Sequence, residues 1–135
     1  MRVIRTTAAD HGRKKQEVLL PARERVAMRA ALRQQQIRRY WENVRVWNPD
    51  YTNRAGEQTG GWQWIDFVFV HRSRLFCILY GAAWRGSGPN AAQKRWHEQK
   101  KRLLEKRNLP YVVVKRNGTG QDYQMAIYKM LHLTK

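Results

Sequence analysis

The stretch WIDFVFVHRSRLFCILYG, residues 64–81, decides the fold of this 135-residue chain. Two apolar runs, at about 62–71 and 74–81, are rich in β-branched and aromatic residues and are separated by the short polar tip His71-Arg72-Ser73. Two such runs joined by a short polar connection are typical of a β-hairpin. We therefore expect two adjacent antiparallel strands here.

Asp66 interrupts the first of these strands. Regular alternation would place Ile65, Phe67 and Phe69 on one face of the strand and Asp66 on the other. Both faces are mostly apolar, which is typical of a central strand covered on both sides. Burying an unpaired carboxylate costs several kcal/mol, so such an acid pairs with a cation or binds a metal ion. We expect a metal-binding or catalytic role for Asp66, with a structural arginine pair as the alternative.

The rest of the chain predicts helices and strands around this hairpin. A helix is expected from Pro21 to about Gln36, with a buried stripe of Ala22, Val26, Ala30 and Ile37. The other expected elements are a strand in RRYWENVRVW (38–47), a loop over 51–61, a helix over about 90–107, a strand in YVVVKR (111–116) and a last helix after 117–120. The order αβββαβα predicts a single α/β domain in which helices flank a mixed four-stranded sheet.

Charge is the strongest global signal in the sequence. Lys and Arg number 27 and Asp and Glu 10, which gives a formal net charge of +17. A polyanion that neutralised this charge would release counterions on binding, so nucleic acid is the first expected partner. An anionic membrane surface and a ribonucleoprotein assembly are the alternatives. Residues 1–16 lack apolar periodicity and predict a flexible basic arm with Arg13, Lys14 and Lys15, followed by a folded domain over 17–135.

The hydropathy and the cysteine content of the sequence give further expectations about membrane insertion, disulfide bonds and cellular compartment. No apolar run approaches the roughly 20 residues that span a bilayer, so we expect no membrane insertion. Cys77 is the only cysteine, which excludes an internal disulfide and a zinc site built from cysteines. Its place in an apolar strand predicts a buried core thiol, and a reducing cytoplasm fits.

The chain has an expected opening helix, PARERVAMRAAL, which is followed by five motifs in a fixed order. They are WIDFVFV, HRSR, LFCILYG, AAW and QKRWHEQKKRLLEKRNLPYVVVKR. This succession resembles the PD-(D/E)XK nuclease superfamily, and more closely its very-short-patch mismatch-repair endonuclease branch, over about residues 18–116. The resemblance implies a restriction-endonuclease-like fold and hydrolysis of DNA phosphodiester bonds with Mg²⁺ or Mn²⁺. It also favours DNA over RNA as the partner.

The resemblance also implies roles for particular residues. Asp66 matches the metal-binding aspartate, Leu79 the position whose backbone carbonyl reaches the metal, and Glu24 the acid on the first helix. Tyr80 and Arg85 stand where that branch has catalytic histidines, and its Cys/His zinc site has no counterpart.

Two residues of the second helix complete the candidate catalytic set. His97 could act as a general base, with a solvated histidine as the alternative. Glu98 could supply a second acid, and the alternative is a routine helical pair with Arg102. For Glu24 the alternative is a first-turn acid that stabilises the helix N-terminus.

Aromatic and basic residues form the expected nucleic-acid surface. Trp84 and Arg85 follow the end of a strand, where a ring could stack on bases while the guanidinium holds phosphate. The expected phosphate contacts on the next helix are Lys94, Arg95, Lys100 and Lys101. Two functions therefore remain open: a metal-dependent endonuclease, or a catalytically inactive nuclease fold that binds DNA or RNA structurally, including within a ribonucleoprotein assembly.

Overall fold

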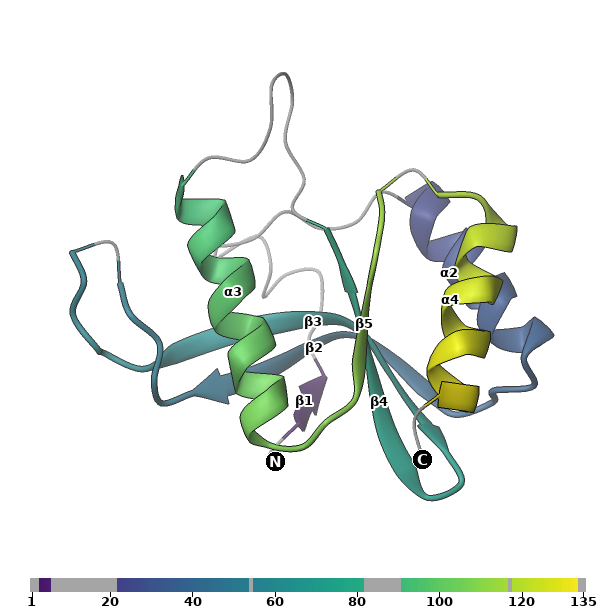
Figure 1. Cartoon of the computed structure of the whole chain (residues 1–135), viewed down its shortest axis with the longest axis horizontal. Helices are drawn as coiled ribbons and strands as arrows, with labels where there is room; N and C mark the ends of the chain where they lie inside the picture. Colours follow the sequence, from purple (N-terminus) through teal and green to yellow (C-terminus); the bar gives the residue numbers. More distant parts are fainter. Residues whose placement is uncertain (1–2, 6–21, 54, 82–90, 117, 134–135) are drawn as a thin grey trace.

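The computed structural model describes residues 3–5, 22–53, 55–81, 91–116 and 118–133 (Figure 1). Its helices are α2 (Ala22–Gln34), α3 (Ala91–Lys106) and α4 (Gly120–Leu133). Its strands are β1 (Val3–Arg5), β2 (Tyr40–Asn48), β3 (Gly61–His71), β4 (Arg74–Tyr80) and β5 (Tyr111–Val114). From α2 to α4 the predicted order αβββαβα is confirmed.

The sheet is mixed, with the strand order β1-β2-β3-β4-β5. Neighbours from β1 to β4 are antiparallel, whereas β5 runs parallel to β4. A parallel pair needs a long crossover connection, and α3 supplies it. The sequence predicted four strands and missed β1, which pairs with β2 through Val3 and Val46. The predicted basic arm otherwise falls on residues outside the described part of the chain.

The β3–β4 hairpin has a two-residue turn. His71 pairs with Arg74, and the turn residues Arg72 and Ser73 have φ angles of 51° and 63°. Two consecutive positive φ angles are typical of a type I′ turn, whose twist matches that of the flanking strands. The turn fixes the register that brings Phe67 opposite Ile78.

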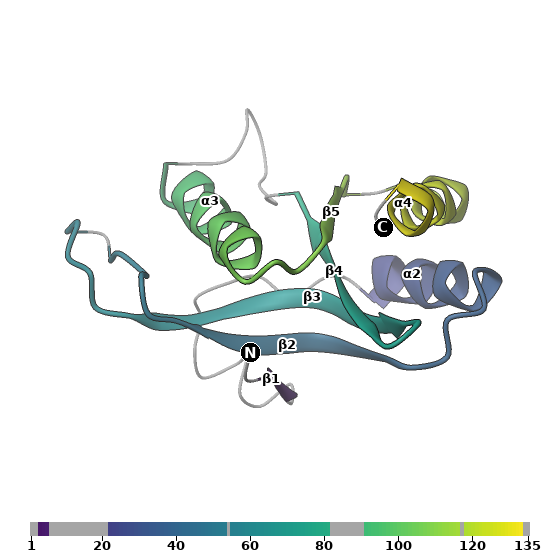
Figure 2. The ribbon, with the colours of Figure 1, turned by 60° about the horizontal axis from the view of Figure 1, so that its bottom comes forward.

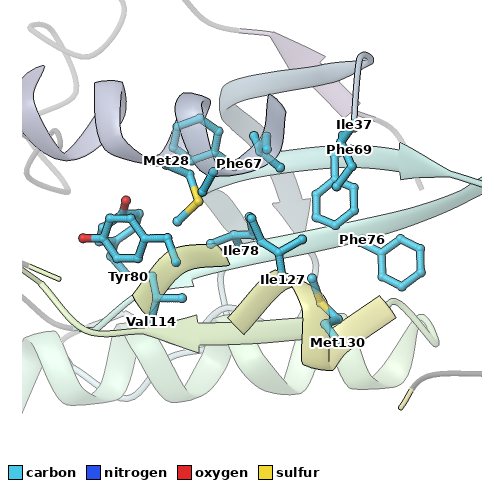
Figure 3. Close-up of a cluster of buried hydrophobic side chains, with 13 residues drawn as sticks. Met28, Ile37, Phe67, Phe69, Phe76, Ile78, Tyr80, Val114, Ile127 and Met130 are labelled. Carbon is cyan, nitrogen blue, oxygen red and sulfur yellow. The ribbon is translucent and has the colours of Figure 1, made fainter. Parts of the chain in front are cut away.

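Two hydrophobic clusters hold the fold together. β4 and β5 run between α3 on one side and the pair α2 and α4 on the other (Figures 1 and 2). The cluster under α2 and α4 is drawn in Figure 3 and includes Met28, Phe67, Phe69, Ile78, Tyr123 and Ile127. The cluster under α3 includes Val44, Val46, Ile65, Val68, Cys77, Leu79, Leu103 and Leu104. Neighbouring residues of β4 thus point into different clusters.

The buried face of α2 differs from the predicted one. Val26, expected on the buried stripe, is 56% exposed, whereas Met28, Ala31 and Leu32 are fully buried. Glu24 lies one turn before Met28 and is also buried, at 3% exposure. Ile37 is buried as predicted, at 2% exposure, but hydrophobicity alone misplaced Val26, because the buried stripe of α2 includes the charged Glu24.

The alternation of β3 breaks at Asp66. Ile65 packs in the α3 cluster, whereas Phe67 packs in the α2–α4 cluster, so the two do not share a face as predicted. Asn43 lies opposite Asp66 in the β2–β3 register, and its φ angle of 52° lies outside the extended region. The break places Ile65 on the α3 face of the sheet together with Val68.

Cys77 is buried, as predicted, and burial raises the pKa of its thiol to about 12. In the unfolded chain a thiol ionises near pH 8.5. The neutral thiol therefore favours folding below that pH, and this contribution is lost as the pH rises toward about 12. We expect Ellman's reagent at pH 8 to leave the native protein unlabelled and to label it in denaturant. Rapid labelling without denaturant would contradict the buried position.

Candidate functional site

Two acidic residues meet at Tyr80, the last residue of β4. The Asp66 carboxylate accepts a hydrogen bond from the Tyr80 backbone N–H, with 2.8 Å between Oδ2 and N. The Tyr80 hydroxyl donates to the backbone carbonyl of Glu24, at 3.2 Å. Burial raises the pKa of the Tyr80 phenol, and Tyr123, Asp66 and Glu24 raise it further. The structure thus brings the first turn of α2, the middle of β3 and the end of β4 together.

Asp66 lies where β3 and β4 separate. Their pairing ends at Phe67 and Ile78, whereas the pairing of β4 with β5 on its other edge, which starts at Cys77, continues to Tyr80 and Val114. The Tyr80 N–H on the β3 side would otherwise lack a ladder acceptor, and the Asp66 carboxylate takes that role. This explains how an acid can occupy an apolar strand.

The backbone carbonyl of Leu79 points away from Asp66. This carbonyl and the Tyr80 N–H belong to one trans peptide, in which they point in opposite directions. The N–H points to Asp66, so the carbonyl points toward β5, where Leu79 pairs with Val113. The geometry therefore does not support the predicted ligand pair of Asp66 and Leu79, because the β4–β5 ladder engages that side of the peptide.

Glu24 is held by a cation that sequence reasoning missed. Its carboxylate Oε2 lies 3.3 Å from Nε of Arg116, which follows β5. This buried oxygen has no hydrogen-bond partner, so the charge interaction with Arg116 is its compensation. The sequence contained one signal for this cation, the basic pair Lys115-Arg116 at the end of YVVVKR. This pair follows β5 at the same end of the sheet as Tyr80. Glu24 is therefore one partner of a buried ion pair, in addition to being an acid in the first turn of α2.

His97 and Glu98 lie on α3, across β4 and β5 from α2 (Figure 1). The Glu98 side chain is 57% exposed, and its carboxylate pairs with Lys101 at 2.7 Å instead of with the predicted Arg102. Lys101 lowers the pKa of Glu98. Among the described residues, no three His, Cys, Asp or Glu side chains group so as to hold a metal ion. Glu24 is the other acid whose charge acts on the Tyr80 phenol.

The predicted nucleic-acid residues divide into three groups. Arg13, Lys14, Lys15, Trp84 and Arg85 lie outside the described residues. On α3, Lys94 is exposed and Lys101 pairs with Glu98. Lys100 is only 7% exposed, so it is not the surface phosphate contact that was predicted, because the helix turns it toward the protein together with Gln99. The side chain of Arg95 has buried Nε and Nη2 atoms without hydrogen-bond partners.

No protein-family model, curated protein or solved structure matches the chain. Within the ranges that the structure describes, none of the helices is long and apolar enough to cross a membrane.

Proposed function

We propose that the protein binds DNA in preference to RNA and hydrolyses its phosphodiester bonds with Mg²⁺ or Mn²⁺ at Asp66. The observation that carries this proposal is that the Asp66 carboxylate binds the Tyr80 backbone N–H, while the charges of both Asp66 and Glu24 act on the Tyr80 phenol. Tyr80 is the last residue of β4, in a chain with a net charge of +17. A carboxylate embedded in so basic a protein suits the binding of a phosphate through a divalent cation.

The topology supports an endonuclease of PD-(D/E)XK type. A helix is followed by a three-stranded antiparallel meander, a crossover helix and a strand parallel to the last one of the meander. The core of that superfamily has this element order and places its metal-binding aspartate on the second strand of the meander, as Asp66 lies on β3. The chain thus resembles that superfamily in the order of its helices and strands and in the position of its aspartate.

The residues present fit a hard divalent cation. Mg²⁺ is commonly held by one or two carboxylates and keeps several waters, so the Asp66 carboxylate can meet the requirement without the Leu79 carbonyl. A bound ion would polarise the scissile phosphate. Asp66 would hold it, and Arg116 would orient the Glu24 carboxylate through their ion pair. The Tyr80 N–H fixes the orientation of the Asp66 carboxylate.

We expect Asp66→Asn to lower the cleavage rate at least about a hundredfold. Changing an outer-shell partner of a metal site already costs about 10–100-fold, and a direct ligand should cost more. Asparagine keeps an oxygen acceptor for the Tyr80 N–H, so the fold should be retained. The assay offers duplex, mismatched and four-way-junction DNA and single-stranded RNA, each with Mg²⁺, Mn²⁺ or EDTA.

Glu57→Gln is the matched control, because it removes one negative charge from an exposed loop residue. We expect its cleavage rate to equal that of the wild type. Metal-dependent cleavage that persists unchanged in Asp66→Asn would contradict the assignment of Asp66. Binding should also weaken steeply with salt, by about 10³–10⁵ between 50 and 200 mM if six to ten phosphates are contacted.

A second candidate is a nuclease fold that binds nucleic acid without cutting it. The observation that favours it is that both acids also have structural partners, Asp66 the Tyr80 N–H and Glu24 the Arg116 guanidinium. Under this alternative the wild type binds DNA or RNA, and no metal ion produces cleavage. Asp66→Ala would then lower stability, by about 1–3 kcal/mol for the unsatisfied N–H, and leave nucleic-acid affinity unchanged.

A further inference from the structure

Aromatic and cationic side chains share one face at the far end of the β2–β3 ribbon. Trp47 pairs with Trp62 and Arg45 with Trp64, so these four side chains form two neighbouring cross-strand pairs. The Arg45 guanidinium lies 4.5 Å from the centroid of the Trp62 ring and 5.9 Å from that of Trp64. The rings of Trp47 and Trp62 meet edge to face, with centroids 5.3 Å apart.

The other face of this ribbon packs against α3. Val46 belongs to the α3 cluster, and the side-chain amide of Gln63 donates to the backbone carbonyl of Trp96 on that helix at 3.0 Å. Side chains alternate along a strand, so Trp47 and Trp62, which neighbour Val46 and Gln63, point away from α3. The aromatic face is therefore not part of the contact with that helix.

The Trp47 ring is exposed and held in place. Its side chain is 41% exposed, which is unusual for a large apolar ring. A Cβ atom on Gly60 would lie 2.6 Å from Cζ2 of this ring, so the ring rests on the glycine backbone. Gly60 also has a φ of 70°, which a residue with a side chain rarely adopts. Gly60 and Trp62 together fix the orientation of the ring.

Arg45 brings a positive charge to this face, and none of the acids in the described part of the chain pairs with it. Its Nε atom is buried and has no hydrogen-bond partner, and the described ion pairs leave Arg45 out. A guanidinium stacked on a tryptophan can still present its other donors to a phosphate. A cation without a counter-charge beside an exposed aromatic ring is the combination that single-stranded nucleic-acid sites use.

We propose that Trp47, Trp62 and Arg45 form a platform on which an unpaired base of single-stranded DNA or RNA stacks. This inference rests on the proposed nucleic-acid binding. It adds that this surface binds the single-stranded form. The base stacks on Trp47, and the Arg45 guanidinium contacts a neighbouring phosphate. Along β3, Trp62 lies four residues before Asp66, a separation of roughly 13 Å at the usual rise of an extended strand. A DNA substrate with an unpaired segment next to the scissile phosphate fits this spacing.

The platform is pre-organised by polar contacts around it. Asn48 donates to the Gln63 side chain at 2.8 Å, and Arg107 donates through Nη2 to the Trp47 carbonyl at 3.1 Å. The Gln99 side chain makes two hydrogen bonds with the backbone of Thr52, at 2.6 and 3.1 Å, and so ties the ribbon's loop to α3. A rigid platform lowers the ordering cost of binding.

The test compares Trp47→Ala with Trp47→Phe and with Tyr128→Ala, which removes a 50% exposed ring on α4. The probes are labelled oligothymidylate, oligouridylate and a DNA duplex of the same length, and the readout is fluorescence anisotropy. We expect Trp47→Ala to weaken single-strand binding about tenfold, as for the loss of one stacked base. Duplex affinity should change by less than about twofold. Trp47→Phe should retain most of the single-strand affinity, and Tyr128→Ala all of it.

The outcomes separate this inference from the proposed function. Loss of affinity for oligothymidylate, oligouridylate or both supports the platform and identifies its ligand. If the wild type binds duplex DNA but Trp47→Ala leaves single-strand affinity unchanged, or weakens both forms equally, the platform is overturned and the proposed function stands. If the wild type binds none of the probes, both are overturned. Thermal unfolding of each variant checks that the fold is retained.

Discussion

Replacing Arg116 with methionine lowers the free energy of unfolding by about 3–5 kcal/mol, the cost of removing one partner of a buried ion pair. Glu24 is 3% exposed, and its Oε2 atom has no hydrogen bond to compensate for the lost guanidinium. Methionine keeps much of the apolar stem of arginine, so the loss of packing should be small. Urea unfolding followed by circular dichroism gives the measurement.

Lys106→Met is the matched control, because Lys106 pairs with Asp50 on the surface at 2.8 Å. An exposed pair contributes less than about 1 kcal/mol, so this variant should unfold close to the wild type. The double variant Glu24→Leu with Arg116→Met removes both charges and should recover most of the loss. Equal stabilities of Arg116→Met and Lys106→Met would contradict the buried pair.

Phe67→Ala is expected to lower the free energy of unfolding by about 3–5 kcal/mol, because it opens a cavity in a packed core. The side chain is fully buried in the cluster under α2 and α4, where Figure 3 shows it beside Met28. Its ring centroid also lies 6.3 Å from that of Tyr40. Urea unfolding and the thermal midpoint measure the loss.

Met125→Ala is the control for this substitution, since Met125 is 51% exposed on α4. A surface change of this kind should stay within about 0.5 kcal/mol of the wild type. A loss for Phe67→Ala that is no larger than the control would mean that Phe67 does not pack as described.

Local patterns in the sequence predicted the elements that depend on local physics. The hairpin over 61–80 follows from two apolar runs and a tight polar turn, whose residues Arg72 and Ser73 adopt the positive φ angles that such turns require. The crossover helix and β5 follow from apolar spacing and a β-branched run. These signals suffice for the order and the approximate bounds of the elements.

Features that depend on distant contacts were missed. The buried face of α2 includes Glu24, which is tolerated because Arg116, which is distant in the sequence and follows β5, pairs with it. The break of alternation at Asp66 depends on β2, where Asn43 lies opposite, and on the end of the β3–β4 pairing at Ile78. The periodicity of one segment does not show which distant segments contact it. The orientation of the Leu79 carbonyl could not be predicted for the same reason, because it depends on the pairing of β4 with β5.

Single-turnover hydrolysis of a labelled DNA, bound by excess protein in EDTA and started with Mg²⁺, tests the role of Asp66 most directly. The wild type should convert the bound DNA to product. Asp66→Asn should form the same complex and cut it at least about a hundredfold more slowly. Equal rates in the two proteins would contradict the account, and so would a wild-type complex that yields no product with either Mg²⁺ or Mn²⁺.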